Sequence, residues 1–254
     1  MQETSALGRV MALVRDLRVR CAWDRVQTRE SLRPYLVEEV LELDQAIAAG
    51  EADAIRDETG DFLLHLAWQL VLGEERGEFT PSDLADHVER KMHRRHPHLF
   101  EQGAPEPWER LKRREHRRGT LSGIPAALPA LLMAWRLQER AAAVGFDWPD
   151  ASGPAAKVRE ELSEVEVELA GGAAAELIEE EIGDLLFAVV NLARKAGVHP
   201  NGALERANRK FRERFSAVEA LAAERGLSLD DAGLERLDAL WDEVKRAGGS
   251  GAPA

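Results

Sequence analysis

The chain has 254 residues, of which 44% are hydrophobic and 31% charged, enough for one large soluble domain or two of ordinary size. Its formal net charge of -12 argues against general affinity for nucleic acid, although metal ions would still allow a polyanionic substrate to bind. The single cysteine excludes an intrachain disulfide, and the absence of an apolar signal core or a membrane-length apolar run predicts a cytoplasmic protein.

Helical periodicity governs the apolar residues along nearly the whole chain. Residues 7–14, 36–47 and 178–189 each carry an apolar stripe at the spacing of one helix face. Glycines stand where these helices are expected to end: Gly50, Gly73, Gly77, Gly145, Gly171, Gly172 and Gly197. No segment alternates as a strand would, so the sequence predicts an all-α fold.

The two halves of the chain repeat one pattern of carboxylates and bases. Residues 38–42 read EEVLE and residues 160–164 read EELSE, while Glu58-x-x-Asp61 recurs as Glu181-x-x-Asp184. A pair of basic residues follows in each half at a nearly constant separation. We interpret this pattern as a tandem duplication of one helical-bundle unit.

The proline- and glycine-containing stretch 120–129 separates the halves and is predicted to be a linker. We therefore expect an N-terminal domain over residues 1–119 and a C-terminal domain over residues 130–247. The small residues 248–254 are predicted to form a disordered tail.

The spacing of the carboxylates in the second half predicts a metal site. Residues three apart share a helix face, which aligns Glu161 with Glu164 on one helix and Glu181 with Asp184 on the next. A turn at residues 171–172 would fold the two helices back on each other. Four facing carboxylates repel one another unless a cation joins them, and oxygen-only ligands suit Mg²⁺ or Mn²⁺.

The same argument gives a possible second metal site in the first half, formed by Glu39, Glu42, Glu58 and Asp61. A di-iron bundle is disfavoured in both halves, because such bundles use Glu-x-x-His and no histidine stands at the required position. Zinc at the closely spaced His93, His96 and His98 is also disfavoured, since Pro97 interrupts any helix there.

Several motifs resemble those of the MazG family of all-α nucleoside triphosphate pyrophosphohydrolases. The resemblance covers nearly the whole chain, and its motifs are specific. Ala22 stands where the family's first motif has proline. The matching segments are CAWDRVQT at 21–28, RRHPHLF at 94–100, VGFDW at 144–148, GDLLF at 183–187 and ANRKFRERF at 207–215.

The resemblance implies a helical homodimer in which dimerisation completes four-helix-type bundles. It also implies hydrolysis of nucleoside triphosphates to nucleoside monophosphate and pyrophosphate, with loose base selectivity and a role in clearing unwanted nucleotides. The second domain is the active one in the family. Carried over to this chain, the metal ligands are Glu161, Glu164, Glu181 and Asp184. The substrate-binding residues are Lys157, Asn208, Lys210, Arg214 and Trp241.

The residue chemistry agrees with these roles. Lys157 lies one turn before Glu161 and can reach phosphates, while Lys210 and Arg214 share a face that can hold phosphate oxygens. Trp241 can stack on any base. We expect Glu160 or Glu161 to act as general base towards a metal-activated water.

The first half lacks two of these groups, because Tyr35 stands at the position of Lys157 and Glu89 at that of Asn208. We therefore expect catalysis in the second half and a structural or weakly active first half. Two alternatives stay open. One is a narrow pyrophosphatase for dUTP, dCTP or a phosphoribosyl nucleotide, and the other is a non-enzymatic helical dimer that binds nucleotides or another protein.

Overall fold

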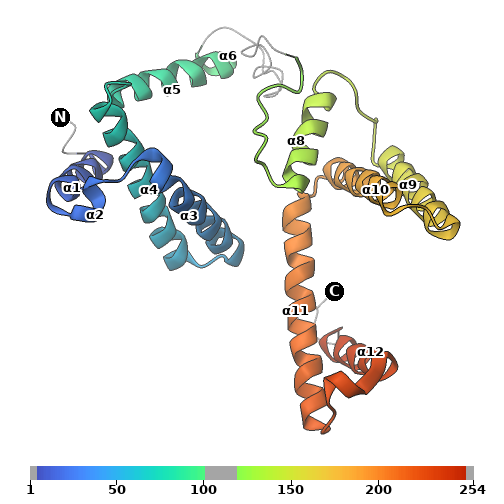
Figure 1. Cartoon of the computed structure of the whole chain (residues 1–254). Helices are drawn as coiled ribbons and strands as arrows, with labels where there is room; N and C mark the ends of the chain where they lie inside the picture. The colour runs from blue at the N-terminus through green and yellow to red at the C-terminus, as the bar shows by residue number, and fades with distance from the viewer. Residues whose placement is uncertain (1–4, 101–118, 250–254) are drawn as a thin grey trace. The chain divides into compact units, whose positions relative to one another are not determined.

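The computed structural model describes residues 5–100 and 119–249, and every regular element in these ranges is an α-helix (Figure 1). This confirms the predicted all-α class. The chain divides into two compact units, Met1–Glu106 and Pro107–Ala254. No helix within the described ranges is long and apolar enough to cross a membrane.

Unit 1 is built around a helical hairpin. Its helices are α1 (Ala6–Arg20), α2 (Ala22–Arg25), α3 (Arg29–Ala49), α4 (Ala52–Glu75), α5 (Pro81–Arg95) and α6 (Pro97–Phe100). Thr28 and Ser31 form a capping box that fixes the start of α3, and Gly50 ends it with a φ of 76°, which glycine adopts without strain. Helices α3 and α4 then pack side by side, with α1 against α4. The core between α1 and α4 contains Met11, Val14, Trp68 and Val71.

Unit 2 contains a second hairpin of the same kind. Its helices are α8 (Ala130–Ala142), α9 (Ser152–Gly171), α10 (Ala175–Lys195), α11 (Pro200–Glu224) and α12 (Leu229–Gly249). Gly172, with a φ of 67°, ends α9 and lets α10 return along it, as the sequence predicts. Buried Gln138 on α8 donates a hydrogen bond to the carbonyl oxygen of Phe187, which ties α8 to α10. Helix α12 packs on α11 around Val218, Ala222 and Leu240.

The glycines confirm most of the expected helix ends, with one error. Gly77, Gly145 and Gly197 follow helices with positive φ angles, as expected. Gly73, however, lies inside α4 and is buried. A Cβ at this position would lie 2.5 Å from the ring of Phe79, so Gly73 permits close packing and does not end the helix.

The segments predicted outside the domains are described only in part. Residues 120–129 form turns without a helix, and α8 begins at Ala130. Helix α12 continues to Gly249, so the first two residues of the predicted disordered tail are helical, and residues 250–254 lie outside the described ranges. The boundary between the two compact units also falls outside them, and the predicted domain limits stay predictions.

Candidate active site

The hairpin of α9 and α10 brings three of the predicted carboxylates together. Glu161 comes from α9, while Glu181 and Asp184 share one face of α10. Oxygen atoms of all three groups lie within 4.8 Å of one another. Glu161 is only 4% exposed, so the cluster has a buried side on α9 and an accessible side on α10.

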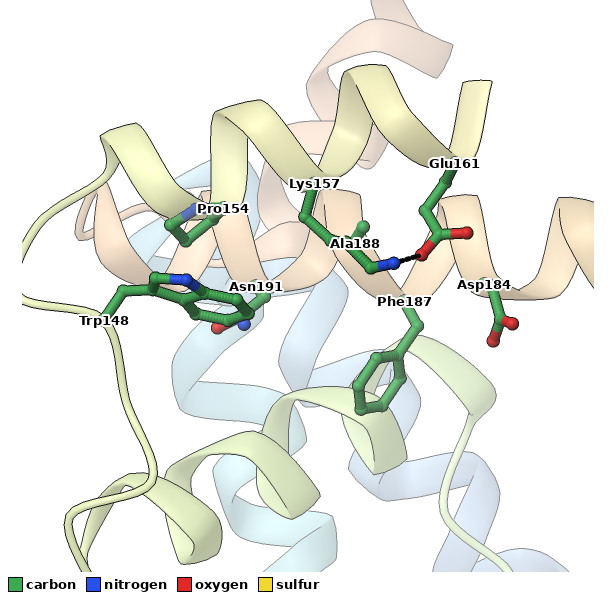
Figure 2. Close-up of a pocket in the computed structure, with 8 residues that line it drawn as sticks. All are labelled: Trp148, Pro154, Lys157, Glu161, Asp184, Phe187, Ala188 and Asn191. Atoms are coloured by element: carbon green, nitrogen blue, oxygen red, sulfur yellow. Dashed lines mark ion pairs between the residues drawn. The ribbon is translucent and has the colours of Figure 1, made fainter. Parts of the chain in front are cut away.

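Lys157 supplies the positive charge beside this cluster. Its Nζ lies 2.5 Å from Oε1 of Glu161 (Figure 2) and donates to Oε1 of Glu160 at 2.8 Å. The hydrogen bond from Lys157 lowers the pKa of Glu161, and the two carboxylates raise the pKa of Lys157. Glu161 is therefore ionised at neutral pH, the state that a metal ligand requires.

The negative charges of the remaining acids are disfavoured by neighbouring carboxylates and by burial. The hydrogen bond shared with Glu161, together with burial, raises the pKa of Glu164. Burial and the charges of Glu161 and Asp184 raise the pKa of Glu181. Glu164 is not among the three groups that meet within 4.8 Å, although it lies one turn along the same helix. A divalent cation would relieve this repulsion, because it interacts favourably with the ionised form of each acid.

The acids lie at one end of a pocket of about 310 Å³ (Figure 2). Its lining residues are Trp148, Pro154, Lys157, Glu161, Asp184, Phe187, Ala188 and Asn191. Glu161 and Asp184 stand at one end, Trp148 and Asn191 at the other, and Lys157 lies between them. The pocket thus joins two carboxylates and an ammonium group to an aromatic and amide surface.

The loop before α9 is anchored firmly enough to place Trp148. Arg194 donates to Asp147 at 2.5 Å, and Nζ of Lys195 donates to the carbonyl oxygen of Trp148 at 2.7 Å. The indole lies so close to Gly153 that a Cβ there would be 2.1 Å from Cδ1 of Trp148. Both ends of the pocket are therefore positioned by contacts within unit 2.

Sequence reasoning missed Trp148, Phe187 and Asn191 as lining residues. A signal for Asn191 was present, because it follows Asp184 by two helical turns on α10 and so shares its face. Trp148 lies in the VGFDW motif, but its contact with the start of α9 depends on tertiary ion pairs that periodicity does not reveal.

Four predicted substrate-binding residues do not line this pocket. Asn208, Lys210 and Arg214 lie on α11, where the first two are exposed, and Trp241 lies on α12. The Trp241 ring packs against Phe211, with ring centroids 5.3 Å apart. Of the predicted contacts to the nucleotide, only Lys157 adjoins the carboxylate cluster in this chain.

The hairpin of unit 1 gathers the equivalent acids. Oxygen atoms of Glu39 on α3 and of Glu58 and Asp61 on α4 lie within 4.8 Å of one another, whereas Glu42 stays outside this group as Glu164 does. Burial and the charge of Asp61 raise the pKa of Glu39, and burial and Glu42 raise that of Glu58. Tyr35 stands one turn before Glu39, at the position of Lys157, and within residues 5–100 no lysine forms an ion pair with these acids.

A buried histidine stands beside the unit 1 acids. His65 is 7% exposed, and its Nε2 lies 3.9 Å from Oε1 of Glu39. Nδ1 is buried without a hydrogen-bond partner. Burial lowers the pKa of His65, so the neutral imidazole is favoured at neutral pH.

Comparison with known proteins identifies the family of this chain. The model of the MazG nucleotide pyrophosphohydrolase domain matches residues 27–100 and 154–218. The chain belongs to the MazG family. It is 42% identical over 231 residues to the Thermotoga maritima nucleoside triphosphate pyrophosphohydrolase/pyrophosphatase MazG, covering 89% of each chain. It is 38% identical over 258 residues to the Escherichia coli K12 nucleoside triphosphate pyrophosphohydrolase, covering 97% of this chain and 98% of that protein.

The two segments that match the MazG domain each contain one acidic hairpin. The segment 27–100 includes Glu39, Asp61 and His65, and the segment 154–218 includes Lys157, the unit 2 acids and the bases of α11. Trp148 and Trp241 lie outside both segments. The match thus covers the carboxylate clusters and leaves both tryptophans beyond its limits.

Proposed function

We propose that this MazG family member is a Mg²⁺-dependent cytoplasmic hydrolase that converts nucleoside triphosphates to nucleoside monophosphates and pyrophosphate. Loose base selectivity would suit it to removing non-canonical or excess nucleotides. The main support is the unit 2 pocket, in which Glu161 and Asp184 stand at one end, an aromatic side chain at the other and Lys157 between them. The relatives named nucleoside triphosphate pyrophosphohydrolases support the same reaction.

The donor set of the unit 2 cluster fits a hard divalent cation. Glu161, Glu181 and Asp184 would hold it, with Glu164 as a fourth ligand, and carboxylate-only ligation favours Mg²⁺ or Mn²⁺. Such an ion would supply positive charge for the triphosphate and would lower the pKa of a water molecule. Lys157 would hold the phosphates from the other side. Of the two acids proposed as general base, only Glu161 lines the pocket.

The pocket also suggests where the nucleoside lies. With the phosphates at the acids, the base extends towards Trp148, whose face can stack on any base and so accounts for loose selectivity. Oδ1 of Asn191 accepts hydrogen bonds from Arg194, which leaves the Nδ2 group to donate to a substrate. Trp148 is thus a second candidate for base stacking besides Trp241.

A homodimer would explain two features of unit 2. Large apolar side chains of α9 and α10 are exposed, including Leu162 at 46%, Ile182 at 42% and Leu186 at 53%. A second copy packed on this face would cover them and complete a four-helix-type bundle. The same association offers a route by which Asn208, Lys210 and Arg214 reach a carboxylate cluster that they do not line in their own chain.

A tandem duplication with one active copy accounts for the two hairpins. The same three motif positions meet in each unit, and the MazG domain matches each hairpin separately. Only unit 2 has Lys157 beside its acids and Asn208 on the following long helix, where unit 1 has Tyr35 and Glu89. Unit 1 therefore serves the architecture or acts weakly.

Product analysis with a matched pair of variants tests this proposal. Asp184→Asn and Asp61→Asn alter the same motif position in the two units. Each is incubated with a panel of ribo- and deoxynucleoside triphosphates and Mg²⁺, after its oligomeric state has been checked. We expect pyrophosphate and monophosphate from wild type and Asp61→Asn, and almost none from Asp184→Asn.

Other outcomes distinguish the alternatives. Wild-type rates in Asp184→Asn, or release of phosphate and diphosphate, would overturn the proposed reaction. Hydrolysis of a single deoxynucleotide would favour the restricted pyrophosphatase. Nucleotide binding without hydrolysis by the wild-type chain would favour the non-enzymatic dimer.

A further inference from the structure

An amide side chain lines the end of the unit 2 pocket that lies away from the acids. Asn191 is 8% exposed and stands at this end together with Trp148 (Figure 2). It follows Asp184 on α10 by two helical turns, or about 10 Å. When the phosphates of a nucleotide lie at the acids, this separation puts the amide beside the nucleoside.

A guanidinium group fixes the orientation of this amide. Nε and Nη2 of Arg194 donate hydrogen bonds to Oδ1 of Asn191 at 3.0 Å and 2.7 Å. Arginine has five donors and no acceptor, so the amide oxygen must face Arg194 and the NH₂ group must face away from it. A flipped amide would place donors against donors. Arg194 thus decides which end of the Asn191 amide is offered to a ligand.

The NH₂ group of Asn191 has no partner within the protein. Among residues 5–100 and 119–249, no atom accepts a hydrogen bond from its Nδ2. A donor that loses its water without gaining an acceptor weakens the complex that buries it. A ligand that fills this end of the pocket therefore binds best when it presents an acceptor to Nδ2.

All nucleobases carry an acceptor at the edge next to the sugar. Purines have the ring nitrogen N3 there, and pyrimidines have the carbonyl oxygen O2. At the opposite edge the donors and acceptors are arranged differently in each base, so a group that contacts that edge selects among bases. A single donor that contacts N3 or O2 binds every base in the same way, which agrees with loose base selectivity.

We propose that Nδ2 of Asn191 donates a hydrogen bond to N3 of a purine or O2 of a pyrimidine, and that Arg194 is the positioning residue for this contact. Trp148 covers the face of the base, and Asn191 contacts its edge. The inference rests on the proposed function, because it takes the ligand of the pocket to be a nucleotide. It adds the atom of the base that the protein recognises.

Unit 1 has apolar side chains at the two matching positions. Trp68 follows Asp61 by the interval that separates Asn191 from Asp184, and Val71 stands at the position of Arg194. Both residues are buried in the core of unit 1. The pair of amide and guanidinium therefore belongs to unit 2, the unit that also has Lys157 beside its acids.

Two analogues of ATP test the contact in the wild-type chain. In 3-deaza-ATP a C–H group replaces N3, and in 7-deaza-ATP a C–H group replaces N7 on the opposite edge. We expect KM for 3-deaza-ATP to be about 10-fold above that for ATP, since the buried donor is left unpaired. KM for 7-deaza-ATP should stay close to the ATP value. Equal KM values for ATP and 3-deaza-ATP, or an equal increase for both analogues, would overturn the proposal.

Asn191→Asp removes the donor and keeps the shape of the side chain. Aspartate still presents an oxygen to Arg194 but has no N–H group for the base. We expect KM for ATP to rise about 10-fold and the difference between ATP and 3-deaza-ATP to disappear. The added charge affects both substrates alike, so it does not change their ratio. A 3-deaza-ATP penalty that persists in Asn191→Asp would show that another group contacts N3 and would overturn the proposal.

Arg194→Met and Lys195→Met form a matched pair for the positioning role. Arg194 and Lys195 both donate to Asp147, and Arg194 also donates to Asn191. We expect the 3-deaza-ATP penalty to shrink in Arg194→Met and to remain in Lys195→Met. The ratio of two substrates in one variant does not depend on the fraction of chains that fold. The same penalty in both variants would show that Arg194 does not orient the amide.

Binding of uncleavable nucleotides separates this inference from the proposed reaction. Titration calorimetry with the α,β-methylene forms of ATP, 3-deaza-ATP and 7-deaza-ATP measures Kd without turnover. We expect the same order of affinities as in the KM values. If these affinities differ as expected but the chain releases no pyrophosphate from ATP, the contact with N3 stands and the proposed reaction is wrong. Equal affinities for all three would overturn the contact even if hydrolysis occurs.

Discussion

In unit 2 the ammonium of Lys157 lies 2.5 Å from a buried glutamate, whereas in unit 1 the equivalent position holds Tyr35 and a buried imidazole stands on the opposite helix. Both hairpins gather three acids from the same motif positions. Their neighbours then decide how the negative charge is compensated. The helical spacing thus creates an acidic cluster in each unit, while one or two flanking side chains determine its chemistry.

Of the residues that differ between the two units, Lys157 should have the largest effect on activity. Replacing it with methionine removes the charge that pairs with Glu161 and that we propose to hold the phosphates. We expect kcat/KM for nucleoside triphosphates to fall about 100-fold, as when one preorganised charge donor is lost. Tyr35→Phe, at the matched position in unit 1, should leave the rate almost unchanged. If kcat/KM of Lys157→Met is within a few-fold of the wild-type value, the proposed difference in activity between the units is wrong.

Packing of α4 provides a test within unit 1 alone. Gly73→Ala places a methyl group 2.5 Å from the Phe79 ring and should destabilise the fold by about 2 kcal/mol, a typical cost of overpacking. Gly60→Ala in the same helix meets no atom within 4 Å and should stabilise it by roughly 0.5–1 kcal/mol through helix propensity. Denaturant unfolding of both variants measures the two effects. Equal stability of the two would contradict the close approach at Gly73.

The aromatic end of the pocket should affect binding of every base alike. Trp148→Ala removes the proposed stacking surface and should raise KM about 10-fold for each nucleoside triphosphate, since stacking contributes about 1–3 kcal/mol per base. Phe146→Ala provides the control, because Phe146 lies in the same loop, is 80% exposed and does not line the pocket. If KM is unchanged in Trp148→Ala, Trp148 does not stack on the base, and Trp241 is the remaining candidate.

The smallest predicted effect concerns the pH dependence of the free energy of unfolding. The contributions of Glu39 and Glu161 should change with pH in opposite directions. The pKa of Glu39 is raised above 4.5, so the native state holds its proton more tightly than the unfolded chain. The stability of wild type relative to Glu39→Gln should therefore fall as pH rises above 4.5. The pKa of Glu161 is lowered below 4.5, so the stability relative to Glu161→Gln should fall as pH drops below 4.5.

Unfolding in the presence of a chelator, from about pH 3 to pH 7, measures both slopes. Added divalent metal should reduce the slope measured with Glu39→Gln, because it stabilises the ionised acids. Slopes of the same sign for the two pairs would show that Lys157 does not distinguish the clusters.

Helical periodicity accounts for what could be predicted from the sequence. The helices, the return at Gly172 and the two acidic clusters depend on spacing within a helix and on one tight turn, which are local properties. Gly73 was interpreted wrongly, because its role depends on a ring six residues away that packs against it only in the folded unit.

The missed residues depend on contacts between distant segments. Trp148 reaches the pocket through the ion pair between Asp147 and Arg194, which are far apart in sequence. His65 belongs to none of the recognised motifs, and only its burial beside Glu39 draws attention to it. The spacing of Glu164 predicted a fourth member of the cluster, but spacing does not decide which carboxylate atoms meet most closely.

The position of Trp148 in the pocket depends on the absence of a side chain at Gly153. With glycine at position 153, the indole lies against the first turn of α9, and any larger side chain would displace it. Position 153 is therefore a suitable site for engineering the substrate selectivity of the pocket. Substitutions there should change which nucleosides the pocket admits while leaving the carboxylates and the lysine intact.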